Sequence, residues 1–229
     1  EVKPGLTVIL GPNGAGKTLL LHTLAGIRPA AGGVVRMADR NLHAWPRRDL
    51  ARQLALLPQN VEDPFPATVL ETVLLGRHPH ISRWRWETAQ DLALARAALE
   101  SVGLHGYEQR DVFTLSGGER RRTAIAAVLA QAPALFLMDE PTNHLDPSHQ
   151  IEALELLRAR ADAGAGVIVT LHDPNLAARY SDRALLIEAD GAWICGDSAT
   201  TLSAGNLSRV FSTRFEGIDH GGRRLFFQG

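Results

Sequence analysis

A glycine-rich loop near the start of the sequence carries the clearest chemical signal. It lies between apolar stretches at 6–10 and 19–25 and has the pattern Gly-x-x-x-x-Gly-Lys-Thr. Its residues are Gly11, Pro12, Asn13, Gly14, Ala15, Gly16, Lys17 and Thr18. In such a loop, backbone N–H groups turn towards phosphate oxygens, the lysine adds a charge for the β- and γ-phosphates, and the threonine hydroxyl can bind Mg²⁺. The pattern predicts a strand, a phosphate-binding loop and a helix that bind a nucleoside triphosphate; the alternative is a tight turn without a ligand.

A second turn that could bind an anion lies at 115–119, with the sequence Leu-Ser-Gly-Gly-Glu. A helical sequence follows over 120–132 and ends at Pro133, so the two glycines fall at a helix N-terminus. Exposed N–H groups and the positive end of the helix dipole favour a terminal phosphate at such a place. A Ser-Gly-Gly turn taken alone is more often a helix cap without a ligand.

Two acidic residues, Asp139 and Glu140, follow the apolar segment 135–138. Strand ends of parallel sheets present ligand-binding groups. Asp139 can therefore support Mg²⁺, which leaves Glu140 to act on water. The structural alternative is that both acids pair with arginines, because a buried carboxylate without a partner is costly.

Apolar segments that alternate with helical patterns predict the fold class. Strands are expected at 6–10, 54–57, 134–138, 167–171 and 184–187, which indicates an α/β protein with a mainly parallel sheet. One amphipathic helix starts after Asp146-Pro147 and buries Ile151, Leu154, Leu157 and Ala161. A second buries Leu92, Ala95, Leu99 and Val102 and stops at Gly103. The interval 61–115 shows no convincing strand and is predicted to be a helical insertion.

The composition limits the classes of protein to consider. The chain has 229 residues, a net charge of −1 and one cysteine. This charge argues against general nucleic-acid binding, and the single cysteine fits a reducing, cytoplasmic compartment. Cys195, next to Trp193 and Ile194, is expected to be buried and unreactive. No apolar run approaches the roughly 20 residues of a membrane span, and the start of the chain lacks a signal-peptide pattern.

The motifs occur in the order found in the ATP-binding-cassette (ABC) ATPases, and the chain resembles that family over nearly its whole length. Three further matches are Gln59 after a strand, the segment Asn-His-Leu-Asp at 143–146, and His172 after the strand at 167–171. The resemblance implies one nucleotide-binding domain over 1–229. In it, a P-loop (RecA-like) core at 1–60 and 116–229 carries an inserted helical subdomain at 61–115.

The resemblance also implies cofactors, partners and residue roles. ATP and Mg²⁺ are the expected cofactors, and two copies of the chain pair head to tail around ATP, with Asp146 linking the two sites. Glu140 would polarise the attacking water, His172 would contact the γ-phosphate, and Gln59 and Lys17 would complete the catalytic set. The expected Mg²⁺ ligands are Thr18, Gln59 and Asp139. The expected ATP-binding residues are Gly11, Pro12, Asn13, Gly14, Ala15, Gly16, Lys17, Thr18 and Leu19 of one chain, and Ser116, Gly117, Gly118, Glu119 and Asp146 of the other.

The sequence departs from the family pattern in two places. The turn at 115–119 ends in Glu119, where Gln is commonest in the family, although many importer ATPases have glutamate there. More importantly, the aromatic residue that stacks on adenine in family members has no counterpart upstream of Leu6. Recognition of the base is therefore not visible in the sequence.

Two segments resemble one group within the family. The stretch 75–80, Leu-Gly-Arg-His-Pro-His, and the stretch 171–180 look like those in the ATPases of importers for ferric siderophores, haem and cobalamin. Membership implies a pair of membrane permease subunits, a periplasmic substrate-binding protein and a peripheral place on the cytoplasmic face of the bacterial inner membrane. The alternatives are an ABC exporter ATPase and a soluble ABC ATPase that acts on DNA or the ribosome.

Two arginine-containing runs are less decisive. The run 83–86, Arg-Trp-Arg-Trp, lies within the helical insertion and best fits a permease contact. The alternatives are ordinary surface packing and, last, stacking on single-stranded nucleic acid. The run Arg120 to Arg122 is expected to be a solvated or interface face of its helix, with a nucleic-acid patch as the alternative. The tail 223–229 is expected to be a natural final strand with an expression scar, and no role is assigned to it.

Overall fold

The computed structural model describes residues 3–60, 66–82, 85–221 and 223–229. Its central sheet has the strand order β4-β5-β6-β1-β7-β8, in which the first five are parallel and β8 is antiparallel to β7. The strands are β1 (Gly5–Leu10), β4 (Leu54–Leu57), β5 (Leu135–Met138), β6 (Gly166–Thr170), β7 (Arg183–Ile187) and β8 (Trp193–Asp197). The predicted α/β class and mainly parallel sheet are confirmed.

The register of the sheet brings the chemical motifs to one edge. Leu57 pairs with Met138, Met138 with Val169, and Val169 with Val8. Because these strands are parallel and in step, the loops that follow β1, β4, β5 and β6 leave the sheet on the same side. This edge therefore holds the site.

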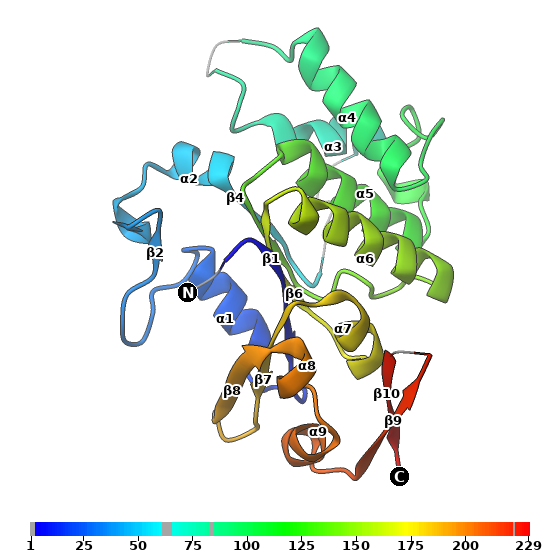
Figure 1. Cartoon of the computed structure of the whole chain (residues 1–229). Helices are drawn as coiled ribbons and strands as arrows, with labels where there is room; N and C mark the ends of the chain where they lie inside the picture. The colour runs from blue at the N-terminus through cyan, green and yellow to red at the C-terminus, as the bar shows by residue number, and fades with distance from the viewer. Residues whose placement is uncertain (1–2, 61–65, 83–84, 222) are drawn as a thin grey trace.

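Helices cover both faces of the sheet (Figure 1). The inner side chains of β1 alternate: Leu6, Val8 and Leu10 join the core cluster with α5 and α6, and Ile9 joins the opposite cluster with α1 and α2. This alternation is the period of two that a strand buried on both faces requires. The helices are α1 (Lys17–Leu24), α2 (Arg47–Gln53), α3 (Val69–Leu74), α4 (Ala89–Ser101), α5 (Gly117–Gln131), α6 (Pro147–Asp162), α7 (Pro174–Tyr180), α8 (Ser198–Thr201) and α9 (Ala204–Phe211).

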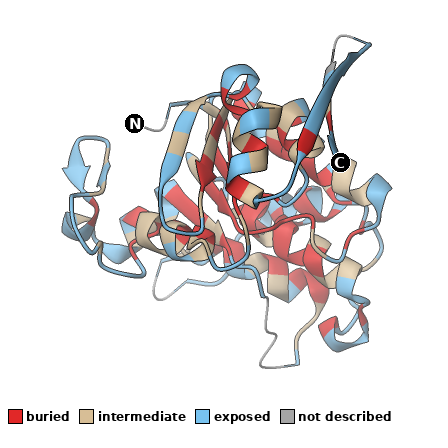
Figure 2. Cartoon of the chain, turned by 90° about the horizontal axis from the view of Figure 1, so that it is seen from below, coloured by how far each residue is buried: buried red, intermediate tan, exposed pale blue. Residues whose placement is uncertain are grey.

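The short elements complete the chain. They are the strand pair β2 (Arg36–Met37) and β3 (Arg40–Asn41), the hairpin β9 (Phe215–His220) and β10 (Arg223–Gln228), and the 3-10 turns Leu42–Ala44, Leu75–Arg77 and Val112–Thr114. Figure 2 shows the buried residues concentrated on the sheet and the inner sides of the helices, whereas the terminal hairpin is largely exposed. The tail is thus a strand that pairs with β9.

Helices α3 and α4 pack on α5 at one end of the molecule (Figure 1). In α4, Ala95 and Leu99 are buried as expected, Leu92 is half-buried, and the helix ends before Gly103, which has a φ of 68°. In the described part of 61–115, β structure is limited to an isolated bridge between Thr68 and Asp111. In α6, three of the four expected residues are buried and Ile151 is half-buried.

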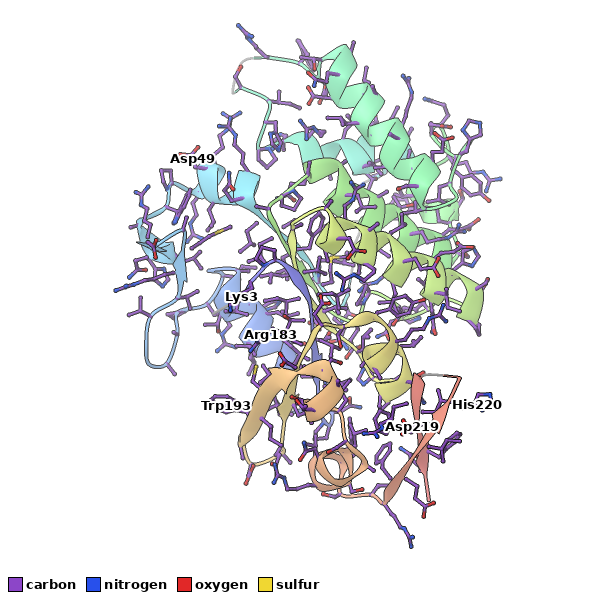
Figure 3. All side chains as sticks on the ribbon, in the orientation of Figure 1. Lys3, Asp49, Arg183, Trp193, Asp219 and His220 are labelled. Carbon is purple, nitrogen blue, oxygen red and sulfur yellow. The ribbon has the colours of Figure 1, made fainter. Side chains whose placement is uncertain are left out.

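The expectation that Cys195 is buried is wrong. It lies on β8, the outermost strand of the sheet, and is exposed. Trp193, on the same face of this strand, is 68% exposed and projects away from the sheet (Figure 3). Side chains alternate along a strand, and in β8 Trp193, Cys195 and Asp197 are exposed whereas Ile194 and Gly196 are half-buried. The apolar neighbours of Cys195 in the sequence therefore did not indicate burial.

Candidate active site

The loop between β1 and α1 has the backbone that its glycines predict. Gly14 and Gly16 adopt φ values of 83° and 92°, a region that residues with a side chain rarely occupy. Gly11 is required for a different reason, since a Cβ atom there would lie 2.4 Å from the carbonyl oxygen of Ile187. The loop leads directly into α1, with Gly16 as the N-cap residue. The N-terminus of α1 thus faces the space that the loop encloses, as in anion sites.

Lys17 lies within this loop and is buried, with 6% of its surface exposed. Its ammonium donates hydrogen bonds to the carbonyl oxygens of Gly11, at 2.7 Å, and Pro12, at 3.0 Å. Burial lowers the pKa of Lys17, and the nearby carboxylates Glu140 and Asp139 oppose that shift. The cation is therefore held against the first residues of the loop, and both acids lie near enough to act on it.

Asp139 follows β5 and is fully buried. Its Oδ1 accepts a 2.7 Å hydrogen bond from the hydroxyl of Thr170, but its buried Oδ2 has no hydrogen-bond partner among the described residues. A buried carboxylate oxygen without a partner is costly unless it binds a cation. Mg²⁺ prefers oxygen ligands, and it is usually held by one or two carboxylates together with waters and substrate phosphates. The unpaired oxygen of Asp139 thus fits the expected Mg²⁺.

Glu140 is held by side chains from three loops. Its Oε1 lies 2.6 Å from His172 Nε2, and its Oε2 accepts hydrogen bonds from Gln59 Nε2, at 2.9 Å, and from the amide of Asn143. Its own N–H donates to the Thr170 hydroxyl at 2.7 Å. Burial opposes ionisation of this carboxylate, but the charge of His172 and the hydrogen bonds outweigh burial and lower the pKa of Glu140. The ionised form is favoured, as a group that polarises water requires.

The turn at 116–119 forms a reciprocal helix cap. The Ser116 hydroxyl accepts from the Glu119 N–H at 3.2 Å, and the Glu119 carboxylate accepts from the Ser116 N–H at 2.8 Å. These hydrogen bonds lower the pKa of Glu119. Gly118 lies against the segment 143–146, since a Cβ atom there would be 3.0 Å from the His144 carbonyl oxygen. Glu119 therefore serves the cap, and both Ser116 and Gly117 remain exposed.

Asp146 is the N-cap residue of α6. Its carboxylate accepts hydrogen bonds from the His149 N–H at 3.0 Å and the Ser148 hydroxyl at 2.8 Å, and its Oδ2 lies 2.8 Å from His149 Nδ1. The backbone hydrogen bond from His149 is the largest of the causes that lower the pKa of Asp146. The exposed carboxylate is thus ionised, and its hydrogen bonds to the first turn of α6 fix its orientation.

The structure assembles one part of the expected site and leaves the other separate. Gln59, Asp139, Glu140 and His172 meet at one edge of the sheet, near Lys17. Among the described residues, no hydrogen bond or ion pair joins the turn 116–119 to the loop 11–18. The alternative that Asp139 and Glu140 each pair with an arginine side chain does not occur in the part of the chain that the structure describes.

Sequence reasoning missed the roles of two residues here. Thr170 joins Asp139 to Glu140, and Asn143 binds the Glu140 carboxylate. The available signal for Thr170 was a hydroxyl residue within the otherwise apolar stretch 167–171. For Asn143, the signal was an amide three residues after Glu140.

The expectation for the arginines at 120–122 is wrong in part. Arg121 is buried, with 4% of its surface exposed, and its guanidinium contacts backbone carbonyls instead of solvent. Arg120 and Arg122 are half-buried. Helix α5 packs between the sheet and the helices α3 and α4. Adjacent residues of a helix are about 100° apart around its axis. The three arginines therefore face different surroundings.

A phosphate-loop helix, a strand-end acid pair and a parallel sheet together define a P-loop nucleotide-binding protein. A family model described as ABC transporter matches residues 2–143. The hemin import ATP-binding protein of Pseudomonas entomophila is 43% identical over 217 residues, which cover 92% of this chain and 84% of the relative. The cobalamin import ATP-binding protein of Halobacterium salinarum is 42% identical over 211 residues, which cover 91% of this chain and 52% of the relative. The chain belongs to the ABC transporter family and is an ATPase domain of that family.

Solved structures agree with this assignment. The chain superposes on a metal-chelate type ABC transporter in an inward-facing conformation with a TM-score of 0.82 and 28% identity, covering 99% of this chain and 86% of that one. A dimeric ATP-binding cassette bound to ADP and Pi shares the fold, with a TM-score of 0.75, 24% identity, and coverage of 86% and 88%. Within the described residues, we find no helix long and apolar enough to cross a membrane.

Proposed function

We propose that this chain hydrolyses ATP to power a bacterial ABC importer of a metal chelate such as haem, a ferric siderophore or cobalamin. The main evidence for the proposed hydrolysis is the Glu140 carboxylate. It is ionised and buried, and its contacts with Gln59, Asn143 and His172 fix its orientation. The names of the relatives, for hemin and cobalamin import, support the choice of cargo.

The phosphate loop and its lysine bind the triphosphate. The N–H groups at the start of α1 and the Lys17 ammonium surround the phosphates, and Leu19 follows Thr18 in the first turn of that helix. Lys17 then exchanges its bonds to the Gly11 and Pro12 carbonyls for phosphate oxygens, which stabilises charge on the transferred phosphoryl group. Asp139, the Thr18 hydroxyl and Gln59 would hold Mg²⁺, which when bound would neutralise phosphate charge.

The hydrolytic step depends on Glu140 and His172. Glu140 accepts a hydrogen bond from the attacking water and raises its nucleophilicity. His172, 44% exposed on its side chain and in contact with Glu140 Oε1, reaches the γ-phosphate and orients that water. Because Glu140 already has three side-chain partners, its direction is fixed before ATP arrives.

A second copy of the chain completes the site. Ser116 and Gly117 of the turn 116–119 are exposed, and the turn makes no described bond to its own phosphate loop, so it is available to the nucleotide of a partner. Its helix-end N–H groups suit a γ-phosphate. Asp146 lies in the neighbouring segment and bridges the two sites. The dimeric relative with the same fold supports this arrangement.

The chain contributes energy, and other subunits hold the cargo. A pair of permease subunits receives the cargo from a periplasmic substrate-binding protein. The permease also holds the chain at the cytoplasmic face of the inner membrane. No nucleic acid takes part. The helical subdomain at 61–115, inserted between core segments 1–60 and 116–229, contacts the permease. Of the run 83–86, Arg83 and Trp84 lie outside the described residues, whereas Trp86 is 88% exposed and suits such a contact.

The ATPase assignment is tested with Glu140→Gln, which keeps the shape and loses the charge. We expect turnover to fall at least about 100-fold, while ATP binding and an ATP-dependent dimer persist. Glu155→Gln, an exposed change on α6, is the matched control and should retain wild-type turnover. Hydrolysis at the wild-type rate by Glu140→Gln would refute the catalytic assignment.

The importer assignment is tested separately by isolating the tagged chain from detergent-solubilised membranes of its source. Mass spectrometry should identify a multi-spanning permease among the co-purifying proteins. Recovery of only soluble or nucleic-acid-bound proteins would favour the alternative of a soluble ABC ATPase, and recovery of an exporter permease would favour the exporter. Both outcomes would leave the ATPase chemistry intact.

A further inference from the structure

One buried arginine donates hydrogen bonds to five backbone carbonyl oxygens around the acids. Arg121, on the second turn of α5, donates from Nη1 to the carbonyl oxygens of Pro58, at 2.8 Å, and Gln59, at 3.2 Å. It donates from Nη2 to the carbonyls of Asp139 and Glu140, the latter at 2.8 Å. Its Nε donates to the carbonyl of Pro141 at 3.3 Å. A single guanidinium thus joins α5 to the loop after β4 and the loop after β5.

The chemistry of this contact requires arginine. Guanidinium has a planar fork of five N–H donors, whereas lysine offers a point charge on a flexible stem. Burial lowers the pKa of Arg121 to about 10, against the opposing effect of Asp139 and Glu140, so the side chain stays charged at neutral pH. Its removal would take one hydrogen-bond donor from each of these carbonyls, three of which belong to the buried residues Asp139, Glu140 and Pro141, and the loss of hydrogen bonds to buried groups is costly.

Glu140 depends on outside support for its backbone conformation. It has a φ of 49°, a left-handed conformation that a residue with a side chain adopts at a cost unless its surroundings hold it. Its N–H donates to the Thr170 hydroxyl, and its carbonyl oxygen accepts from Arg121, at 2.8 Å, and from the N–H of Asn143, at 3.1 Å. Arg121 is therefore one of the groups that fix the two peptide groups flanking the Glu140 side chain.

The position of Arg121 in α5 connects the acids to the turn 116–119. Helix α5 starts at Gly117, directly after Ser116, so Arg121 and the turn 116–119 belong to one rigid element. We propose that Arg121 is a positioning residue that ties this turn to Glu140 and Gln59 of the same chain. Contact of the turn with a partner's nucleotide is then transmitted through Arg121 to the chain's own carboxylate. The inference rests on the proposed catalytic role of Glu140.

The next residue of the helix provides a matched control. Arg122 also donates from its guanidinium to backbone carbonyls, those of Val102 at 3.0 Å and Gly103 at 3.2 Å. These carbonyls lie at the end of α4, away from the acid pair. Arg121→Lys and Arg122→Lys therefore make the same chemical change on the same helix, and each retains the positive charge and most of the stem.

The two variants are compared by steady-state ATP hydrolysis, after melting curves have established the temperature at which both are folded. For Arg121→Lys we expect kcat to fall about tenfold or more, with KM for ATP within about twofold, because positioning acts after binding. For Arg122→Lys we expect both constants to stay within about twofold of wild type. An apolar variant of similar length, Arg121→Met, should lose at least as much kcat as Arg121→Lys.

Three results would overturn the inference. They are a kcat of Arg121→Lys equal to that of Arg122→Lys, equal proportional changes in kcat and KM, and wild-type kcat in folded Arg121→Met. If Arg121→Met does not fold, the comparison of the two lysine variants decides alone. Failure of the proposed function is distinguishable, because it would show as retained hydrolysis in Glu140→Gln, whereas failure of this inference leaves that variant inactive.

Discussion

The hydroxyl of Thr170 donates a 2.7 Å hydrogen bond to Asp139 Oδ1 and leaves Oδ2 of the same buried carboxylate without a hydrogen-bond partner among the described residues. The same hydroxyl accepts from the N–H of Glu140. One threonine thus sets the rotation of the acid proposed to bind Mg²⁺ and the backbone of the acid proposed to act on water. Both proposed functions depend on a residue that would itself touch neither ATP nor metal.

Replacement of this hydroxyl should affect stability and metal dependence together. Thr170→Val keeps the shape and leaves a buried N–H and a carboxylate oxygen unsatisfied, which costs about 1–3 kcal/mol. We expect a lower melting temperature and a higher Mg²⁺ concentration for half-maximal ATPase activity. The control is Thr123→Val, a buried hydroxyl on α5 that donates to the Glu119 carbonyl. An unchanged Mg²⁺ requirement in Thr170→Val would contradict the positioning role.

The close approach at Gly118 should make turnover sensitive to one methyl group. Gly118→Ala places a Cβ atom 3.0 Å from the His144 carbonyl oxygen, so the turn 116–119 must shift from its neighbouring segment. Because a misplacement of about 1 Å can strongly reduce rate, we expect turnover to fall about tenfold while nucleotide binding to the monomer is retained. Fluorescent ATP-analogue titration and phosphate release measure the two quantities.

A glycine elsewhere provides the control for that experiment. Gly205, on α9, has open space at its Cβ position. Gly205→Ala should leave turnover unchanged and raise stability by about 0.5–1 kcal/mol, since alanine is favoured over glycine in a helix. Equal turnover in the two variants would show that the turn 116–119 tolerates displacement.

The start of α4 should contribute stability that depends on pH. The hydrogen bonds from Thr88, with a further contribution from Arg77, lower the pKa of Asp91 to about 2. Because the folded-state pKa is depressed, the contribution is complete above the unfolded-state value near 3.8 and is lost as the pH falls through about 2. Asp91→Asn should cost about 1–2 kcal/mol at pH 7.

Denaturant unfolding at several pH values tests this sign. The difference in unfolding free energy between wild type and Asp91→Asn should be constant from neutral pH down to about pH 5 and should shrink below it. Glu100→Gln, an exposed change near the end of the same helix, should show no comparable difference. A cost for Asp91→Asn that grows on acidification would contradict the assignment.

The exposure of Cys195 should be visible without unfolding. A thiol reagent such as a disulfide dye should modify one cysteine per native chain, because the sequence has one and it is exposed on β8. Absorbance of the released chromophore gives the stoichiometry, and Cys195→Ser provides the blank. Reaction only after denaturant is added would mean that β8 is covered in solution.

Local contacts in the site follow from residues close together in the chain. The cap between Ser116 and Glu119, the N-cap of α6 by Asp146, and the backbone turns at Gly14 and Gly16 each depend on residues within a few positions. Local spacing restricts their geometry to a few options. The mainly parallel direction of the strands also followed from alternating apolar and helical patterns, because these patterns allow few ways to bury both faces of a sheet. The order of the strands came only from the structure.

Contacts between distant segments needed the tertiary structure. Thr170 and Asp139 are separated by 31 positions, Arg121 and Pro58 by 63, and Gln59 and Glu140 by 81. Their residue types alone do not say which surface each side chain faces, as the wrong expectations for Arg121 and Cys195 demonstrate. The sequence by itself determined the chemistry available, since a phosphate loop, a capped helix end and an acid pair have local signatures. The tertiary structure decided the orientation of the Asp139 and Glu140 side chains. The hydrogen bonds that orient them join different loops, and these loops meet only when the sheet brings its strand ends together.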